Sequence, residues 1–334
     1  MKKEHNVELS AAELANLWGQ YQNDTLSVCT IKHFLANIED KEIKKILEYA
    51  LELSNKHIQF LHKLFSDEKM VIPQGFTDDD VVAQAPRLFT DGFYLIYIQN
   101  MGKIGMDIYS LALANSARLD VSKYFTECLY SSAELYNRAS SVMLDKGIMM
   151  RAPQIPKSKK VEFVQKQSFL TGWFNRRRPI NALEISHIYF NLLRNILGEA
   201  LLTGYSQVAK LEEVRKYLIR GRDIASKHVE IFNSVMSEEL LPSPSTWITP
   251  PTDSTVAPFS DKLMLYQVTS LNGIGIGHYG ASLGASMRRD LASHYTRILT
   301  EIAQYSEDGI NIMIDQGWLE KPPHSVDRNH LAKD

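Results

Sequence analysis

The amino-acid sequence predicts an all-α protein that consists of two tandem four-helix bundles. The first observation behind this prediction is an internal repeat, because the Lys-His pair of segment 54–58 recurs in segment 225–229, 171 positions later. The second is helical spacing of apolar residues, which is the same at positions 14–18 and 185–189. The third is that no convincing run of alternating apolar residues competes as a β-strand.

Each copy opens with the same helix-start signal. Ser10 is followed three residues later by Glu13, and Asn181 by Glu184, so both copies have the form of a capping box. The periodic segments predict eight helices, at roughly 11–37, 41–66, 91–116 and 121–146 in the first copy and 182–208, 212–239, 261–287 and 291–316 in the second.

The later helices are bounded by short polar residues and glycines. The offset drops to 170 before the third helix, where segments 89–91 and 259–261 match and predict helix caps. Asp120 and Asp290 are expected to cap the fourth helix of each copy. Both fourth helices are expected to end at a glycine in the left-handed conformation, Gly147 and Gly317.

A proline-bearing connection of about two dozen residues separates the second and third helices of each copy, long enough to run the length of a bundle. Pro73 and Phe76 in the first connection match Pro244 and Trp247 in the second. The other connections within each copy are short, so the helices that they join are antiparallel and the second and third helices are parallel. This is the single-crossover topology of ferritin-like bundles.

We therefore expect a first four-helix bundle at 1–150, a linker at 151–180, a second four-helix bundle at 181–323 and a tail at 324–334. The 334 residues are 44% hydrophobic and 23% charged, which is enough apolar content for two cores. The net charge of −2 argues against a nucleic-acid surface, and the basic cluster Arg176–Arg178 favours a solvated linker.

The sequence carries no sign of export or of a membrane span. The N-terminal residues 1–6 are followed by no apolar run, so no signal peptide is expected. No stretch of about twenty apolar residues occurs without polar interruption. The two cysteines, Cys29 and Cys128, are expected to be reduced core residues. We expect a soluble, cytoplasmic protein.

The Lys-His helices, the Pro-Phe/Trp crossovers and the Asp-x-Gly helix ends together resemble a known family over nearly the whole chain. It comprises uncharacterised proteins of endospore-forming bacteria that are built from ferritin-like four-helix bundles, some of them described as putative spore-coat proteins. The resemblance implies the fold and a spore context, and it supplies no catalytic residues.

A ferritin-like bundle raises the hypothesis of a di-iron site, which uses a Glu-x-x-His motif on each of two helices. Within the predicted helices only Glu184 and His187 form this motif, and their counterparts in the first copy are Glu13 and Asn16. Because Glu184 is already accounted for by the capping box, an intact di-iron centre is not expected.

A weaker metal hypothesis concerns the second copy, which has one histidine on each predicted helix. Counting residues from one end of the bundle places His228 and His278 at the same level, with Asp223 as a carboxylate ligand for zinc, iron or copper. The remaining two histidines, His187 and His294, lie roughly 8 Å away along the bundle. The competing interpretation is that these histidines are packed or hydrogen-bonded helix residues.

Two further features have structural and functional interpretations. His57 and His228, which the repeat aligns, are either core histidines bonded to a buried carboxylate or carbonyl, or residues with a shared role. The glycines of segment 273–284 recur every four residues and let a helix, another subunit or a flat ligand approach closely, with helix packing favoured. No Ser-His-Asp or Cys-His arrangement can be argued from the sequence.

Two functions from different classes are consistent with these features. The first is a non-catalytic structural or interaction protein, associated with the spore, which binds protein partners or itself and needs no cofactor. The alternative is a metal- or small-molecule-binding bundle with its site among the histidines of the second copy. The first is favoured because the metal motifs are degenerate.

Overall fold

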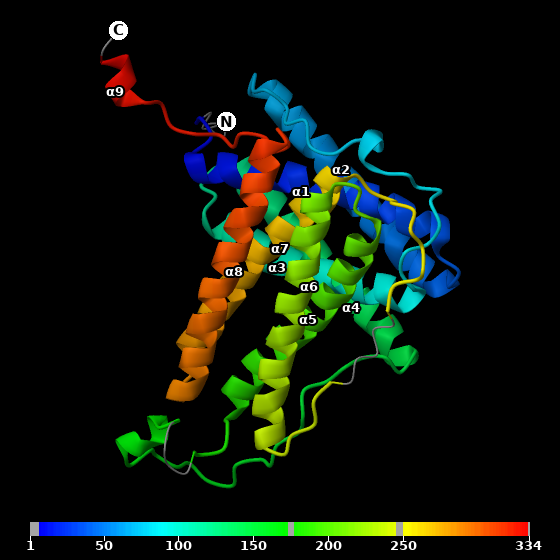
Figure 1. Cartoon of the computed structure of the whole chain (residues 1–334). Helices are drawn as coiled ribbons and strands as arrows, with labels where there is room; N and C mark the ends of the chain where they lie inside the picture. The colour runs from blue at the N-terminus through cyan, green and yellow to red at the C-terminus, as the bar shows by residue number, and fades with distance from the viewer. Residues whose placement is uncertain (1–6, 173–176, 245–249, 333–334) are drawn as a thin grey trace.

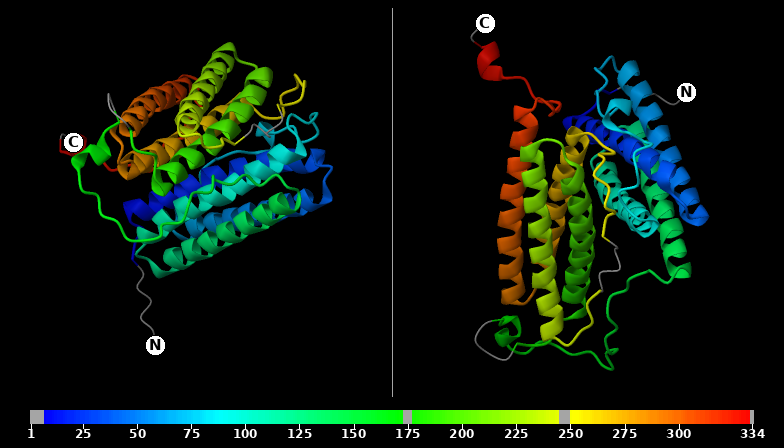
Figure 2. Two further views of the ribbon diagram at one scale, coloured as in Figure 1. Left: turned by 90° about the horizontal axis from the view of Figure 1, so that it is seen from below. Right: turned by 45° about the vertical axis from the view of Figure 1, so that its right-hand side comes forward.

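The computed structural model describes residues 7–172, 177–244 and 250–332. The described residues form two four-helix bundles that lie side by side with their axes at an angle (Figures 1 and 2), so the predicted all-α tandem fold is confirmed. The first bundle consists of α1 (Ala11–Asn37), α2 (Lys41–Asp67), α3 (Asp91–Ala114) and α4 (Leu119–Asp145). The second consists of α5 (Ala182–Val208), α6 (Glu212–Glu238), α7 (Asp261–Ala285) and α8 (Arg289–Asp315). Three short helices lie outside the bundles: η1 (Asp78–Asp80), η2 (Gln167–Leu170) and α9 (Arg328–Leu331).

Both predicted capping boxes are present at the start of the bundles. The Ser10 hydroxyl accepts from the backbone N–H of Glu13, and the Asn181 side chain accepts from that of Glu184. Each glutamate in turn accepts from the backbone N–H of its cap residue, so two free N–H groups are satisfied at each helix start. The fourth helices also end as expected, at Gly147 with φ 69° and Gly317 with φ 67°.

The prediction that Asp120 and Asp290 cap the fourth helices is wrong. Arg118 and Arg288 occupy the cap positions and make no side-chain cap hydrogen bond. Each arginine instead donates from Nη2 to the aspartate two residues later, at 2.7 Å in both bundles. The aspartates therefore hold an arginine at the turn before the helix.

Repeated hydrogen bonds fix the helix order within each bundle. The Asp91 carboxylate accepts from the backbone N–H of Asp40 at 2.8 Å, and Asp261 accepts from that of Leu211 at 2.7 Å. The third helix therefore begins beside the turn between the first two helices, so the second and third helices run in the same direction. The single crossover predicted from the connection lengths is confirmed.

The opposite end of each bundle is closed by the glutamate of the capping box. Glu13 Oε1 accepts from the backbone N–H of Arg118 at 2.8 Å, and Glu184 Oε1 from that of Arg288 at 3.0 Å. One carboxylate thus joins the start of the first helix to the turn between the third and fourth, and the duplication extends to individual hydrogen bonds.

The two crossovers pair with each other between the bundles. The Val82 N–H donates to the Pro258 carbonyl at 2.8 Å, and the Thr252 N–H donates to the Leu88 carbonyl at 2.9 Å. Val82 and Thr252 are equivalent in the repeat, as are Leu88 and Pro258, since each pair is 170 positions apart. The same contact is therefore made twice with the roles of the copies exchanged, as at the interface of a two-fold dimer.

A polar pair lies between the bundles and follows the same symmetry. Tyr97 and Gln267 are equivalent residues, 170 positions apart, and the Gln267 amide donates to the Tyr97 hydroxyl. The carbonyl oxygen of the same amide accepts from the hydroxyl of Tyr205. All three side chains are buried, and these hydrogen bonds give each of the three a polar partner.

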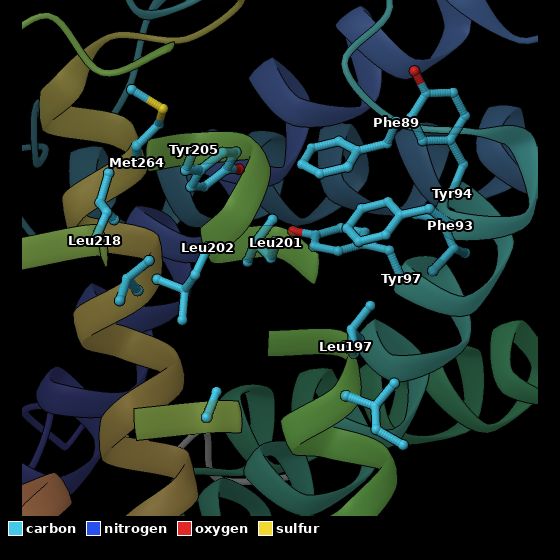
Figure 3. Close-up of a cluster of buried hydrophobic side chains, with 14 of the residues drawn as sticks. Phe89, Phe93, Tyr94, Tyr97, Leu197, Leu201, Leu202, Tyr205, Leu218 and Met264 are labelled. Carbon is cyan, nitrogen blue, oxygen red and sulfur yellow. The ribbon is translucent and has the colours of Figure 1, made fainter. Parts of the chain in front are cut away.

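One hydrophobic core is shared by both bundles (Figure 3). Phe89 of the first crossover stacks on Phe93 of α3, with ring centroids 4.0 Å apart, and contacts Tyr205 of α5 at 6.2 Å. A Cβ atom at Gly204 would lie 2.6 Å from the Phe89 ring, so this position of α5 requires glycine. A smaller core cluster that includes Leu17, Phe125 and Cys128 lies within the first bundle alone.

Part of the basic cluster is not a solvated linker, contrary to expectation. Arg177 Nη1 donates to Glu238 at 2.6 Å, and Arg178 Nη2 donates to Glu184 at 2.8 Å, so both arginines tie the linker to the second bundle. Arg176, Trp247 and residues 1–6 lie outside the described residues. No helix in the described part of the chain has the length and apolar character needed to cross a membrane.

Candidate functional site

His228, the central residue of the predicted histidine site, is fully buried in the second bundle. Its Nδ1 lies 3.0 Å from the Tyr279 hydroxyl, and its Nε2 lies 3.1 Å from Glu301 Oε2. Burial lowers the pKa of His228 to about 4, against the opposing effect of Glu301. The neighbouring Lys227 faces outward, as the helical spacing predicts.

His57, the equivalent residue of the first bundle, also contacts a carboxylate. Its Nδ1 lies 3.1 Å from Asp24 Oδ2, which confirms the interpretation of both histidines as core residues that bond to an acidic partner. Burial opposes protonation of His57, but the charge and hydrogen bond of Asp24 outweigh it and raise the pKa to about 10. The residue equivalent to Asp24 is Asn195, which carries no charge, and Glu301 does not offset the burial of His228, so the pKa values of the two histidines shift in opposite directions.

The other predicted metal ligands are not brought together with His228. His278 Nε2 lies 2.9 Å from Asp107 Oδ2 of the first bundle, and His187 Nδ1 lies 3.1 Å from the Ser282 hydroxyl. Asp223 is exposed and receives a hydrogen bond from Arg222, whereas His294 is half-buried on α8. In the ranges that the structure describes, no three His, Cys, Asp or Glu side chains are arranged to hold a metal ion.

The glycine-rich stretch of α7 does not serve helix packing at most of its positions. A Cβ atom at Gly273, Gly277 or Gly280 would meet nothing within 4 Å, so the expected close approach of a helix is absent there. Gly275 is different, because a Cβ atom at this position would collide with Nη1 of Arg194. This glycine makes room for a guanidinium group.

A cleft of about 590 Å³ lies between the bundles beside these residues, and we call it the inter-bundle cleft. Its apolar wall includes Phe190 and Leu193 of α5 and Met106 of α3. His187 and His278 also line it, so two of the predicted histidines face one cleft although they do not face each other. Further lining residues are Lys103, Asp107, Tyr136, Met149, Met150, Ala152, Ser186, Tyr189 and Ala281.

A narrow neck of about 40 Å³ continues from the cleft and shares Lys103, Phe190 and Leu193 with it. The neck shares Asn100 and Arg194 with a third hollow, an interior cavity of about 70 Å³ that is lined by the second bundle and by α3 of the first. The side chains that line the interior cavity include those of Tyr97, Leu197, Leu201, Leu202, Ile224, His228, Asn272 and Tyr279, four of which are labelled in Figure 3. Because they share wall residues, the cleft, the neck and the interior cavity adjoin one another, and we refer to the three together as the path to His228.

Arg194 lies where the neck meets the interior cavity. Its guanidinium carbon stacks 4.7 Å from the centre of the Tyr279 ring, while Nε and Nη2 are buried without a hydrogen-bond partner. No carboxylate within the described ranges forms an ion pair with it. A buried donor without a partner costs about 1–3 kcal/mol, and more when it is charged. Arg194 is thus a cation that lacks an anion.

Lys103 is a second unpaired cation, at the junction of neck and cleft. Burial lowers its pKa, and its Nζ lies 5.8 Å from the centre of the Tyr136 ring. The nearest carboxylate along α3, that of Asp107, is occupied by His278. The cleft also contains polar atoms without a hydrogen-bond partner in the described chain, because His278 Nδ1 and the Tyr189 hydroxyl are buried and unpaired. The path therefore combines apolar walls with positive charge and unpaired polar atoms.

The sequence predicted three histidines that line this path, His187, His228 and His278. It did not predict the two cations. Lys103 lies on α3 and Arg194 on α5, and neither belongs to a motif. The one available signal was Gly275, a glycine within a helix, whose close contact turns out to be Arg194.

A family model described as "Protein of unknown function (DUF3231)" matches residues 1–161 and again residues 168–331. The chain therefore belongs to this family, which confirms the resemblance noted in the sequence. The comparison with curated proteins finds no match. Among solved structures, a Bacillus halodurans protein described as a putative spore coat protein is 15% identical with a TM-score of 0.41, over 45% of this chain and 98% of that chain.

Proposed function

We propose that this member of the DUF3231 family binds a small amphipathic anion, with the anionic group in the neck and an apolar chain along the inter-bundle cleft. The observation that carries the proposal is the pair of half-buried cations, Arg194 and Lys103, which have no acidic partner in the described chain. A carboxylate bound between them would accept charge-assisted hydrogen bonds from both.

The chemistry of the walls supports an apolar chain. Met106, Met149 and Met150 line the cleft together with Phe190 and Leu193. Methionine side chains adapt to irregular apolar partners, and a cleft of 590 Å³ is within the size range of small-molecule sites. The neck adds Gln99, Asn100 and Arg194 to Lys103, which gives the anionic group a polar end. The cleft combines its apolar wall with polar side chains that include Asp107 and His278.

The proposal is tested by calorimetric titration of the full chain with decanoate, which supplies a carboxylate and a ten-carbon chain. 1-Decanol is the control for charge and hexanoate the control for chain length. We expect decanoate to bind more tightly than both, because decanol lacks the anion and hexanoate loses about 0.8 kcal/mol for each buried methylene that it lacks.

Two substitutions locate the site. Arg194→Gln removes a charge-assisted contact of about 1.5–3 kcal/mol, which is roughly a 10- to 150-fold loss of affinity, and Lys103→Met is expected to act in the same direction. Arg138→Gln and Lys123→Met remove equal charges from exposed positions of α4 and should leave binding unchanged. Equal binding of decanoate and decanol, or no effect of Arg194→Gln, would falsify the proposal.

The structural role implied by the family resemblance is a separate proposal. A protein that assembles at the spore surface should be recovered with the coat fraction of purified spores, whatever its ligand. Detection of the chain in growing cells and its absence from spores would remove this role without affecting anion binding.

A further inference from the structure

A further cavity, of about 130 Å³, lies where α1 and α3 of the first bundle meet α7 of the second, and we call it the second interior cavity. It adjoins the interior cavity of the path, because both are lined by Ile104 and Ile274. Three residues of its wall are the repeat equivalents of residues that line the interior cavity: Asn23 of Arg194, Asp24 of Asn195 and Tyr109 of Tyr279. The two cavities are thus related by the repeat but differ in charge, with a cation in one and a carboxylate in the other.

Gln20 contributes a buried acceptor without a partner to the second interior cavity. The residue is 4% exposed, and its amide Nε2 donates to the Tyr109 hydroxyl at 3.2 Å. Its Oε1 is buried, and no hydrogen-bond donor of the described chain reaches it. Because buried polar atoms are nearly always paired, this oxygen indicates a donor that the chain itself does not supply.

Asp24 and Tyr109 also have hydrogen-bonding capacity to spare. Their equivalents in the second bundle bond to each other, since the Asn195 amide donates to the Tyr279 hydroxyl at 2.8 Å. Within the described ranges Asp24, which is 6% exposed, is bonded to His57 alone and makes no hydrogen bond with Tyr109. Burial, and after it the charge of Asp24, raise the pKa of Tyr109 well above 10, so its hydroxyl keeps a proton that it can donate. The cavity therefore has free acceptors at two side chains and a donor at a third.

The charge of Asp24 is already balanced on its other side. His57 contacts this carboxylate but does not belong to the wall of the second interior cavity, and its pKa of about 10 keeps the imidazole positive at neutral pH. A cationic ligand would therefore add an uncompensated charge to a buried ion pair, which is costly. A neutral ligand with hydrogen-bond donors suits the cavity better.

We propose that the second interior cavity binds a small primary amide with a short apolar chain. A primary amide has two N–H donors, which match Gln20 Oε1 and the Asp24 carboxylate, and a carbonyl oxygen, which matches the Tyr109 hydroxyl. The apolar part of the wall would contact the chain and consists of Leu26, Met101, Ile104, Ile108, Leu271 and Ile274. The volume is roughly ten times the 10–15 Å³ that one water requires, which suits a chain of a few carbons. The site is independent of the proposed anion site, because neither Lys103 nor Arg194 lines it.

The proposal is tested by calorimetric titration of the full chain with pentanamide. Hexan-2-one is the matched control, because it has the same shape and the same carbonyl but no N–H donor. We expect pentanamide to bind at least about tenfold more tightly than the ketone, which leaves both acceptors unpaired. Pentylamine, a cation at neutral pH, should also bind more weakly than pentanamide. Equal binding of pentanamide and hexan-2-one, tighter binding of pentylamine, or no binding of pentanamide would overturn the proposal.

The variant Gln20→Met separates recognition of the amide from the shape of the cavity. It removes the unpaired oxygen and keeps a side chain of similar length, so the preference for pentanamide over hexan-2-one should fall by about fivefold or more. A cavity that is merely distorted would weaken both ligands and keep their ratio. Gln165→Met, the same substitution at an exposed position of the linker, should leave both affinities unchanged. A preference that survives Gln20→Met would refute the assigned contact, and the comparison of the three ligands on the wild-type protein decides without any variant.

Discussion

Arg288 and Arg118 are equivalent residues in the two bundles, and we expect their removal to have very different costs. The Arg288 side chain is 1% exposed and pairs with Asp290, 2% exposed, and with Glu239, 15% exposed. Arg118 makes the same two pairs, but its side chain is 10% exposed and its partners, Asp120 and Glu68, are 49% and 27% exposed.

The magnitudes follow from this difference in burial. Arg288→Met removes the close partner of the buried Asp290 and leaves it only Arg177, whose Nη1 lies 3.8 Å away. Removal of one member of a buried ion pair costs about 3–5 kcal/mol. Arg118→Met leaves carboxylates that water can reach, so its cost should be closer to the value for exposed pairs, about 1 kcal/mol. The free energy of unfolding of both variants would be measured by urea denaturation, followed by circular dichroism and by tryptophan fluorescence.

The double variant Arg288→Met/Asp290→Asn is the control for the proposed mechanism. Because it removes the stranded charge as well, it should be more stable than Arg288→Met alone. The reasoning is refuted if Arg118→Met costs as much as Arg288→Met, or if the second substitution recovers nothing.

Further predictions concern the glycines of α7 and the two buried histidines. Gly277→Ala should stabilise the protein by about 1 kcal/mol, since the added Cβ meets nothing, whereas Gly275→Ala should destabilise it by displacing Arg194; thermal unfolding compares the two. The folded-state pKa of His57, about 10, lies above its ordinary 6.5, so its stabilising contribution is complete below pH 6.5 and is lost as the pH rises to 10. The folded-state pKa of His228, about 4, lies below 6.5, so stability should fall as the pH drops from 6.5 to 4. We would measure the urea midpoint against pH for His57→Gln and His228→Gln. The first variant should lack the fall in stability between pH 6.5 and 10, and the second the fall between pH 6.5 and 4. A curve that matches the wild type would contradict the role given to that histidine.

The helices could be predicted from the sequence because their signals are local. Ser10 with Glu13 and Asn181 with Glu184 mark helix starts within four residues, and the repeat supplies every signal twice. The exception was the fourth helix of each copy. A short acidic residue such as Asp120 resembles a cap, and only the fold shows that it binds an arginine instead.

The site could not be predicted, because it depends on how the bundles are placed. Lys103 of α3 and Arg194 of α5 line the same neck only because the two bundles lie side by side. The spacing of residues along the chain does not predict how the bundles are placed. Asp24 and His57 likewise come from two helices, α1 and α2. Their signal was present but incomplete, since the repeat aligned His57 with His228 and did not reveal the acidic residue that faces each.

The paired crossovers make this chain a dimer fused into one polypeptide. In a two-fold homodimer every substitution is imposed on both halves, whereas a duplicated gene allows each half to change alone. The two cations of the proposed anion site differ in this way: Lys103 corresponds to Gly273, and Arg194 corresponds to Asn23. Fusion therefore allows a molecule to carry one such site, where a symmetric dimer would carry two copies.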